Sequence, residues 1–293
     1  LDGESGENTL GHECIMATVI GKGGEWREID EQLGRCGHQV QQPTDIDRLL
    51  THLRGSFQPY VERKKSEIAQ CVAIEEHRIA TLQAQRGLWR SFVNWFRIQG
   101  CKMSISNLHG EERQHIATLS ENIREVDALH KSRTLAGARA ELDVIAHLAR
   151  LPAGYIVFND LRLTTNRYIH FNGVPLQSAQ IDHLVLSSSG VFVIETKRWS
   201  KHFVESGEYH NPFDQIQRAA YLCYDQLRAE FGKIHVRSLI ACAGQLPSAP
   251  EGSHVKVLAI PELVGYISWF RQTELAPDRL LQVRQYLERF GAS

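Results

Sequence analysis

The sequence of 293 residues predicts an α/β protein, in which strands and helices mix in one domain and an α-helical hairpin precedes it. Two observations predict this fold class. Residues 180–197 hold two apolar runs of strand character around a serine and glycine turn, and helical periodicity flanks them. Before residue 135, apolar residues instead follow the spacing of long packed helices. We therefore expect a segment 1–45 without assigned structure, a helical hairpin or coiled-coil arm at 46–134, and a mixed-sheet domain at 135–293.

The helical arm is predicted by two heptad-like runs, at residues 68–96 and 116–126. Gly100 and Gly110 bracket the segment between the runs, so we expect the chain to reverse there into an antiparallel hairpin. The apolar seam then serves packing within the hairpin. Attachment of a protein partner or of a second copy through this arm is the alternative.

Each helix and strand of the mixed-sheet domain has its own local signal. Apolar residues at helical spacing predict a first helix at 137–150, and the Asn172-Gly173 dipeptide predicts a tight strand turn. Asn211 followed by Pro212 is typical of a helix start. The remaining elements are read in the same way: a short strand at 155–158, a helix from 212 to about 231, strands at 236–242 and 255–260, and a closing helix at 277–290.

The hairpin at residues 180–197 places charged side chains together. An even loop, either Ser188-Ser189 or residues 187–190, sets Asp182 directly opposite Glu195. Opposed residues share one face of the sheet, with Cβ atoms about 4.5–5.5 Å apart. A three-residue turn is the alternative, and it would turn Glu195 to the other face.

Strand alternation adds Lys197 to the same face, opposite Gln180. Two carboxylates at this distance repel each other unless something positive lies between them. Mg²⁺, which Mn²⁺ can replace, suits such a site, because it takes carboxylate and water oxygens and leaves positions open for a phosphate. Lys197 would orient or deprotonate the attacking water. A hairpin whose charged end is merely solvated is the alternative.

These segments resemble a known family. Gln180-Ile181-Asp182-His183 and Ile194-Glu195-Thr196-Lys197 look like the signature of the nuclease-related (NERD) domain of the PD-(D/E)xK nuclease superfamily, over residues 135–290. The resemblance implies an αβββαβ core with a helix glutamate, a strand aspartate and an E-x-K triplet as metal and catalytic groups. It assigns the helix glutamate to Glu141 and an N-P-x-x-Q element to residues 211–215. For Glu141, an ordinary solvated carboxylate is the alternative.

Composition limits the classes of partner. The net charge of −1 excludes a generally basic nucleic-acid-binding protein, so DNA contact would need a local cluster of cations. The candidates for this cluster, for which a solvated edge is the alternative, are Arg162, Arg167, Lys197, Arg198 and Lys201. Without an apolar run of 18 residues or a visible signal peptide, we expect a cytoplasmic location and no membrane partner.

Three further features are expected to be structural. The stretch from Gly21 to Gly24 lacks the spacing of a phosphate-binding loop and is expected to form a turn. Alternation points His183 away from Asp182, which favours a core histidine. The six cysteines are scattered without a C-x-x-C pair, which argues against zinc and against a disulfide framework.

The functional hypothesis is a Mg²⁺-dependent DNA endonuclease, a nicking enzyme or a double-strand cutter, in DNA processing or in defence against foreign DNA. Asp182 and Glu195 would hold the metal, Glu141 would complete its shell, and Lys197 would position the water. Contacts to the phosphate or to the metal-bound water are expected from Gln180, Arg198, Gln215 and Arg218. The alternative is a non-catalytic module that uses a nuclease-like fold to bind nucleic acid or an ATPase.

Overall fold

The computed structural model describes residues 16–85, 88–199, 211–247, 249 and 252–290. The chain divides into two compact units, the first made of residues 1–31 and 133–293 and the second of residues 32–132. In the sequence, the second unit is therefore an insertion between two parts of the first. In the described ranges, no helix combines the length and the apolar character that a bilayer-spanning segment needs.

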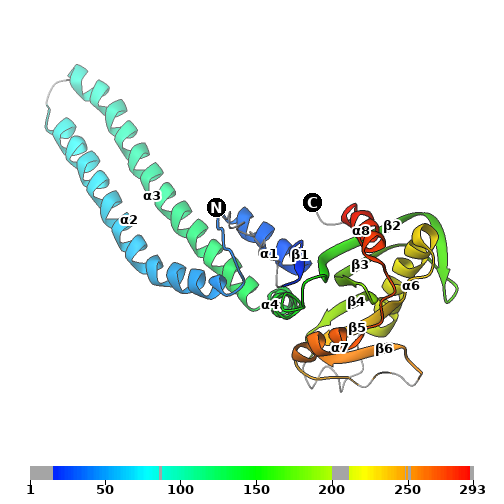
Figure 1. Cartoon of the computed structure of the whole chain (residues 1–293). Helices are drawn as coiled ribbons and strands as arrows, with labels where there is room; N and C mark the ends of the chain where they lie inside the picture. Colours follow the sequence, from blue (N-terminus) through cyan, green and yellow to red (C-terminus); the bar gives the residue numbers. More distant parts are fainter. Residues whose placement is uncertain (1–15, 86–87, 200–210, 248, 250–251, 291–293) are drawn as a thin grey trace, which may run out of the picture. The chain divides into compact units, whose positions relative to one another are not determined.

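The first unit is built on a mixed sheet (Figure 1). Its described strands form one six-stranded sheet in the order β1-β2-β3-β4-β5-β6, with antiparallel pairing in β2-β3-β4 and parallel pairing elsewhere. The predicted mixed α/β fold is thus confirmed. The strands are β1 (Thr18–Ile20), β2 (Ile156–Phe171), β3 (Val174–Ser187), β4 (Gly190–Lys197), β5 (Val236–Cys242) and β6 (Val255–Ala259). The helices are α1 (Gly24–Arg35), α4 (Arg133–Leu148), α6 (Pro212–Phe231), the short 3₁₀ helix Ile260–Glu262, α7 (Leu263–Trp269) and α8 (Pro277–Glu288).

Helices cover both faces of this sheet. One apolar core joins residues of β2 to β5 to α6 and α8, and a second joins the opposite face to α4 and α7. On β4 the side chains alternate between them, because Val193 belongs to the first core and Phe192 to the second. A strand that is buried on both faces has a continuous run of apolar residues, which explains the sequence of β4.

Both hairpin turns lie where the sequence places them. Ser187 pairs with Gly190 across a two-residue turn, so the even loop is confirmed and the three-residue alternative is wrong. Asn172 and Gly173 have φ of 50° and 78° and join β2 to β3. The left-handed backbone at both positions is what a tight hairpin turn requires, and asparagine and glycine adopt it most readily.

The alternation of β2 changes phase at Asp160. Phe158 and Leu161 are three residues apart yet lie in the same core, and Asp160 between them has a φ of 54°. On β3, Ile181 and Leu184 share that core in the same way. Both strands therefore interrupt their regular alternation beside the residues that were expected to form a site.

The helix α6 begins as predicted. The side chain of Asn211 accepts a hydrogen bond from the backbone N–H of Phe213 at 3.0 Å, and Pro212 occupies the first helical position. This satisfies one of the donors that a helix start leaves unpaired. The predicted strand at 155–158 is only the beginning of β2, which continues to Phe171.

The second unit contains two long helices, α2 (Asp45–Ala84) and α3 (Leu88–His130), which pack on each other. The predicted reversal between Gly100 and Gly110 is wrong, because α2 ends at Ala84 and α3 runs from Leu88 through both glycines to His130. A glycine inside a helix costs only about 1 kcal/mol relative to alanine, which the packing of a 43-residue helix readily offsets.

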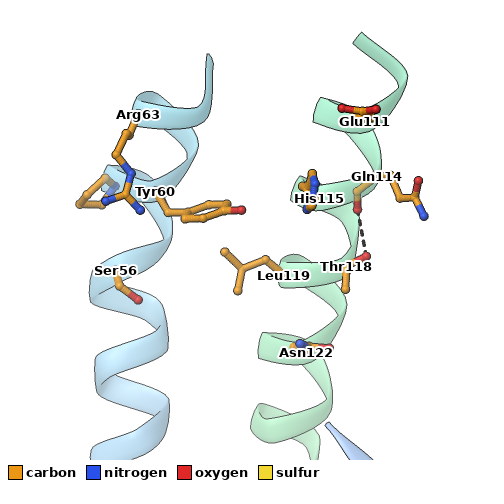
Figure 2. Close-up of a pocket in the computed structure, with 10 residues that line it drawn as sticks. Ser56, Tyr60, Arg63, Glu111, Gln114, His115, Thr118, Leu119 and Asn122 are labelled. Carbon is orange, nitrogen blue, oxygen red and sulfur yellow. Dashed lines mark hydrogen bonds between the residues drawn. The ribbon is translucent and has the colours of Figure 1, made fainter. Parts of the chain in front are cut away.

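The two helices enclose a cavity of about 760 Å³ part-way along their length. Figure 2 shows Tyr60 of α2 pointing toward α3 and Leu119 of α3 pointing toward α2. Close to the start of α2 and the end of α3, Arg54 forms an ion pair with Asp127 at 2.6 Å, and His130 lies 2.7 Å from Asp47.

The predicted seam is only partly packed within the second unit. Ile68 and Val126 are buried, but α2 ends at Ala84, inside the predicted run 68–96, and Val93 and Phe96 of that run are exposed.

The turn between β3 and β4 gives a stability prediction. Gly190 has a φ of 108°, and a Cβ atom there would lie 2.7 Å from the backbone oxygen of His235. Gly190→Ala should lower the free energy of unfolding by about 1–3 kcal/mol, because both the backbone conformation and the contact are strained. Urea unfolding followed by tryptophan fluorescence measures this.

Gly265→Ala is the matched control. Gly265 is an exposed residue of α7, and no atom lies within 4 Å of the position that an added methyl group would take. Alanine there should stabilise the same unit by about 0.5–1 kcal/mol, because it has the higher helix propensity. Equal effects of the two substitutions would contradict the strain assigned to Gly190.

Candidate active site

A cavity of about 980 Å³ lies where β3 and β4 meet the first turns of α1 and α6 and one side of α4. Six carboxylates line it, and one of them, Glu28, lies on α1 one turn after Glu25. The six are Glu25, Glu28, Glu141, Asp160, Asp182 and Glu195. Like charges this close raise each other's pKa unless cations compensate them, so the cavity must be described as one electrostatic system.

Glu195 and Lys197 form the central pair. The ammonium of Lys197 donates to Oε1 of Glu195 at 2.5 Å, and Glu195 is only 1% exposed. Oε2 of Glu195 is buried and has no hydrogen-bond partner. Burial raises the pKa of Glu195 to about 8, with a further increase from Asp182, and Lys197 only partly opposes this.

Lys197 keeps its proton. Burial by itself would lower the pKa of Lys197, but the carboxylate of Glu195 outweighs this effect, and the resulting pKa lies above the ordinary value. At neutral pH the side chain is therefore a cation with no lone pair available for a proton. It can position a water or a phosphate by donating hydrogen bonds.

Asp182 lies on β3 directly before His183, which pairs with Ile194, the residue before Glu195. Its Oδ2 accepts a hydrogen bond from the backbone N–H of Thr196 at 2.7 Å. Burial raises the pKa of Asp182, while this hydrogen bond and the charge of Lys197 oppose the rise. Asp182, Glu195 and Lys197 thus line one cavity, as the register predicts.

Glu141 reaches the cavity from α4. It is 6% exposed, and its Oε2 accepts a hydrogen bond from the backbone N–H of Glu25 at 3.2 Å. Burial raises the pKa of Glu141 to about 8, and Asp182 and Glu25 add to this. The alternative of a solvated helix carboxylate does not describe this side chain.

Three acidic residues of the cavity, Glu25, Glu28 and Asp160, were not predicted from the sequence. Glu25 lies in the first turn of α1, and burial, followed by the charge of Asp182, raises its pKa to about 7. Asp160 accepts a hydrogen bond from Gln180 and pairs with Arg27. The signals that could have found them were the glycine-rich stretch that precedes Glu25 and the polar residues that interrupt the apolar run of β2.

Three of the four residues predicted to contact the phosphate line the cavity, and one does not. Gln180, Arg198 and Gln215 line the cavity. Arg218 is exposed on α6 and does not line it, so this prediction is not supported by the geometry.

The predicted cluster of cations does not form as one patch. Arg167 pairs with Asp225 at 2.7 Å, and Arg162 is exposed on β2 without lining the cavity. Lys197 and Arg198 do line it. Lys201 lies outside the described residues.

His183 is a structural residue, as its position in the strand predicts. It is fully buried, its Nδ1 lies 2.8 Å from the side-chain oxygen of Asn159, and its Nε2 lies 3.0 Å from the hydroxyl of Thr196. Burial lowers the pKa of His183 to about 3, so the ring is neutral. It holds Thr196, whose N–H in turn binds Asp182.

The donor set fits a hard divalent cation that retains water. Glu195 Oε2 is a buried oxygen without a partner, and the neighbouring carboxylates have raised pKa values that a cation would lower. Within the described ranges, no three side chains of the His, Cys, Asp and Glu types are grouped so that they could hold a metal ion by themselves. Mg²⁺ is commonly held by one or two carboxylates and several waters, so a closed cage is not needed.

Comparison with known proteins identifies the domain that contains most of these residues. Residues 136–243 match the family model of the nuclease-related domain, NERD. A crystal structure of protein VC1899 from Vibrio cholerae aligns with 11% sequence identity and a TM-score of 0.27, over 90% of this chain and 62% of that chain. This chain thus corresponds to 62% of the length of that protein, and a TM-score this low does not establish a shared fold. No curated protein sequence matches the chain.

The raised pKa values predict how stability depends on pH in the metal-free protein. Glu141 and Glu195 have pKa values of about 8 in the folded state against 4.5 for the ordinary carboxyl. Their stabilising contribution is complete below pH 4.5 and is lost as pH rises through 8. His183 has a lowered pKa, so its contribution to stability decreases as the pH falls, but only below pH 6.5. From pH 6.5 to 8.5 the free energy of unfolding should therefore fall. The slope is up to about 1.4 kcal/mol per pH unit for each carboxyl that keeps its proton in the folded state and has lost it in the unfolded state.

Urea unfolding at several pH values in EDTA measures this dependence. Glu195→Gln should flatten the slope, because glutamine does not ionise. Glu31→Gln, at an exposed position of α1, should retain it. Stability that rises between pH 6.5 and 8.5 would show that these carboxylates are not protonated in the folded protein.

Proposed function

Because residues 136–243 match the nuclease-related domain, we propose that this protein is a Mg²⁺-dependent endonuclease that hydrolyses phosphodiester bonds of DNA. The observation that carries the proposal is the buried pair of Glu195 and Lys197 beside Asp182, in a cavity large enough to admit a phosphate and its flanking sugars. A hairpin that served only stability would have no need to bury three ionisable groups together, since an ionised group costs several kcal/mol to desolvate.

Asp182 and Glu195 would hold the metal, and Glu141 would complete its shell directly or through water. Bound there, the ion would lower the pKa of water and offset the charge of the phosphoryl oxygens. Mn²⁺ would substitute, since it accepts the same oxygen ligands. The unpartnered Oε2 of Glu195 supports this assignment, because a buried carboxylate oxygen without a donor is otherwise costly.

Lys197 would act as a cation that orients the attacking water and stabilises the pentavalent transition state. Its raised pKa supports this role over that of a general base. In the reaction, the water oxygen bonds to phosphorus and one ester P–O bond breaks. One water is consumed, and the products are a phosphomonoester and an alcohol.

Contacts to the substrate would come from the polar residues of the cavity. The amides of Gln180 and Gln215 can donate to phosphate oxygens, and the guanidinium of Arg198 can pair with a neighbouring phosphate. With a net charge of −1, the protein would use few such contacts. The α2–α3 pair would bind a protein partner, a second copy or further DNA.

Substitution of the central pair tests the proposal. Lys197→Ala and Glu195→Gln should each reduce Mg²⁺-dependent nicking or cutting of a supercoiled plasmid by at least about 10²-fold, the usual effect of removing a group that stabilises transition-state charge. Lys197→Ala should keep its affinity for Mn²⁺, whereas Glu195→Gln should lose affinity.

Lys256→Ala, at an exposed lysine of β6, is the control and should cleave normally. Undiminished cleavage by Lys197→Ala, or cleavage that persists in excess EDTA, would contradict the proposed mechanism. Binding of metal and DNA by the unmodified protein without any cleavage would instead support the non-catalytic alternative.

Two exposed arginines test the DNA contact. Arg198→Ala should make the plot of log affinity against log salt shallower by about 0.9, the contribution of one phosphate contact. Arg218→Ala, which removes an arginine outside the cavity, should leave the slope unchanged. Fluorescence anisotropy of a labelled duplex in Ca²⁺ measures both, and the reverse pattern would move the DNA surface away from the cavity.

A further inference from the structure

Glu25 comes from outside the nuclease-related domain, yet it lies inside the cavity. It belongs to a segment in which β1 pairs in parallel with β2, the chain turns through Gly21 to Gly23, and α1 begins at Gly24. This strand, turn and helix place the first turn of α1 directly beside α4. The residues that do so precede the matched domain by more than 100 positions.

Two glycines make this close approach of the helices possible. A Cβ atom at Gly137 of α4 would overlap the carboxylate of Glu25, and a Cβ atom at Gly23 would lie 2.5 Å from Oε2 of Glu141. Gly137 and Glu141 are four residues apart and lie on one side of α4. The carboxylate of Glu25 therefore occupies the turn of α4 next to Glu141, and the space it fills exists only because residue 137 lacks a side chain.

The oxygen of Glu25 that packs against Gly137 also lacks a hydrogen-bond partner. This atom, Oε2, is buried, and Oε2 of the fully buried Glu195 in the same cavity has no partner either. The backbone N–H of Glu25 binds Glu141, but the side chain of Glu25 makes no equivalent bond through that oxygen. Two unpartnered carboxylate oxygens in one cavity are what a bound cation would satisfy.

We propose that Glu25 is a further ligand of the divalent cation, so that the metal site combines Glu25 and Glu141 from two helices with Asp182 and Glu195 from two strands. This inference rests on the proposed metal-dependent function. It extends the active unit to the segment from β1 to α1, which the family domain does not include. Glu25 binds the ion directly or through one of its waters.

Mn²⁺ binding to the full-length protein tests this without any measurement of activity. Titration followed by electron paramagnetic resonance gives the affinity, and Glu25→Gln should weaken it by about 10-fold or more, as loss of a ligand or of a group bound to one usually does. Glu31→Gln, an exposed glutamate of the same helix, should bind Mn²⁺ as the unmodified protein does.

Gly137→Ala is a second variant that removes no carboxylate. The added methyl group meets only the flexible end of Glu25, so the side chain should move aside while the fold remains. It should weaken Mn²⁺ binding in the same direction as Glu25→Gln. The rise in thermal unfolding midpoint on adding Mn²⁺ should shrink in both variants, and the midpoint without metal reports folding.

The outcomes separate this inference from the proposed function. If Glu195→Gln loses Mn²⁺ affinity while Glu25→Gln keeps it, the role of Glu25 is overturned and the proposed function stands. If the unmodified protein binds no Mn²⁺, the metal site as a whole is overturned, and the role of Glu25 with it. Weakening by Glu25→Gln and Gly137→Ala, but not by Glu31→Gln, supports the inference.

Discussion

The burial of several carboxylates around Glu195 is the constraint on which the rest of the first unit depends. Desolvated carboxylates repel each other strongly, and Lys197 compensates only one oxygen of one of them. The sheet domain tolerates this because its two apolar cores hold the surrounding strands and helices in place. The acidic cavity thus lowers the stability of the fold locally, and packing elsewhere in the same unit offsets this loss.

Buried polar side chains on three strands form a chain of hydrogen bonds that ends at the acidic cavity. His183 links Asn159 on β2 to Thr196 on β4, and the Thr196 N–H holds Asp182. Every residue of this chain of hydrogen bonds has a partner within the sheet, which is the condition under which buried polar groups add rigidity. The backbone N–H of Thr196 therefore orients Asp182, and the fully buried His183 holds Thr196 in place.

The parts of the fold that local sequence determines were predictable. The Ser188-Ser189 turn, the Asn172-Gly173 turn and the Asn211 cap each depend on the conformational preferences of adjacent residues, and all three are present. The register of one hairpin was enough to bring Asp182 and Glu195 together. The reversal of the helical unit was misplaced because glycine marks a turn only where packing does not override its weak helix propensity.

The role of Glu25 could not be read from the sequence for a different reason. Its contact with Glu141 spans 116 residues, and no periodicity or spacing rule operates over that distance. Only the pairing of β1 with β2 brings the two together, and a three-residue strand carries almost no signal of its own. The same holds for Asp160, whose contacts with Gln180 and Arg27 join residues that are distant in the sequence.

The insertion of residues 32–132 between the two parts of the sheet unit has a consequence for evolution. An antiparallel pair of helices returns the chain to where it left, here with Asp47 and His130 in contact, so its two ends stay adjacent whatever its length. Natural variation could lengthen or shorten the pair by whole heptads at its far end without shifting either junction. The reach of the inserted unit can therefore diverge among related proteins while the acidic cavity remains unchanged.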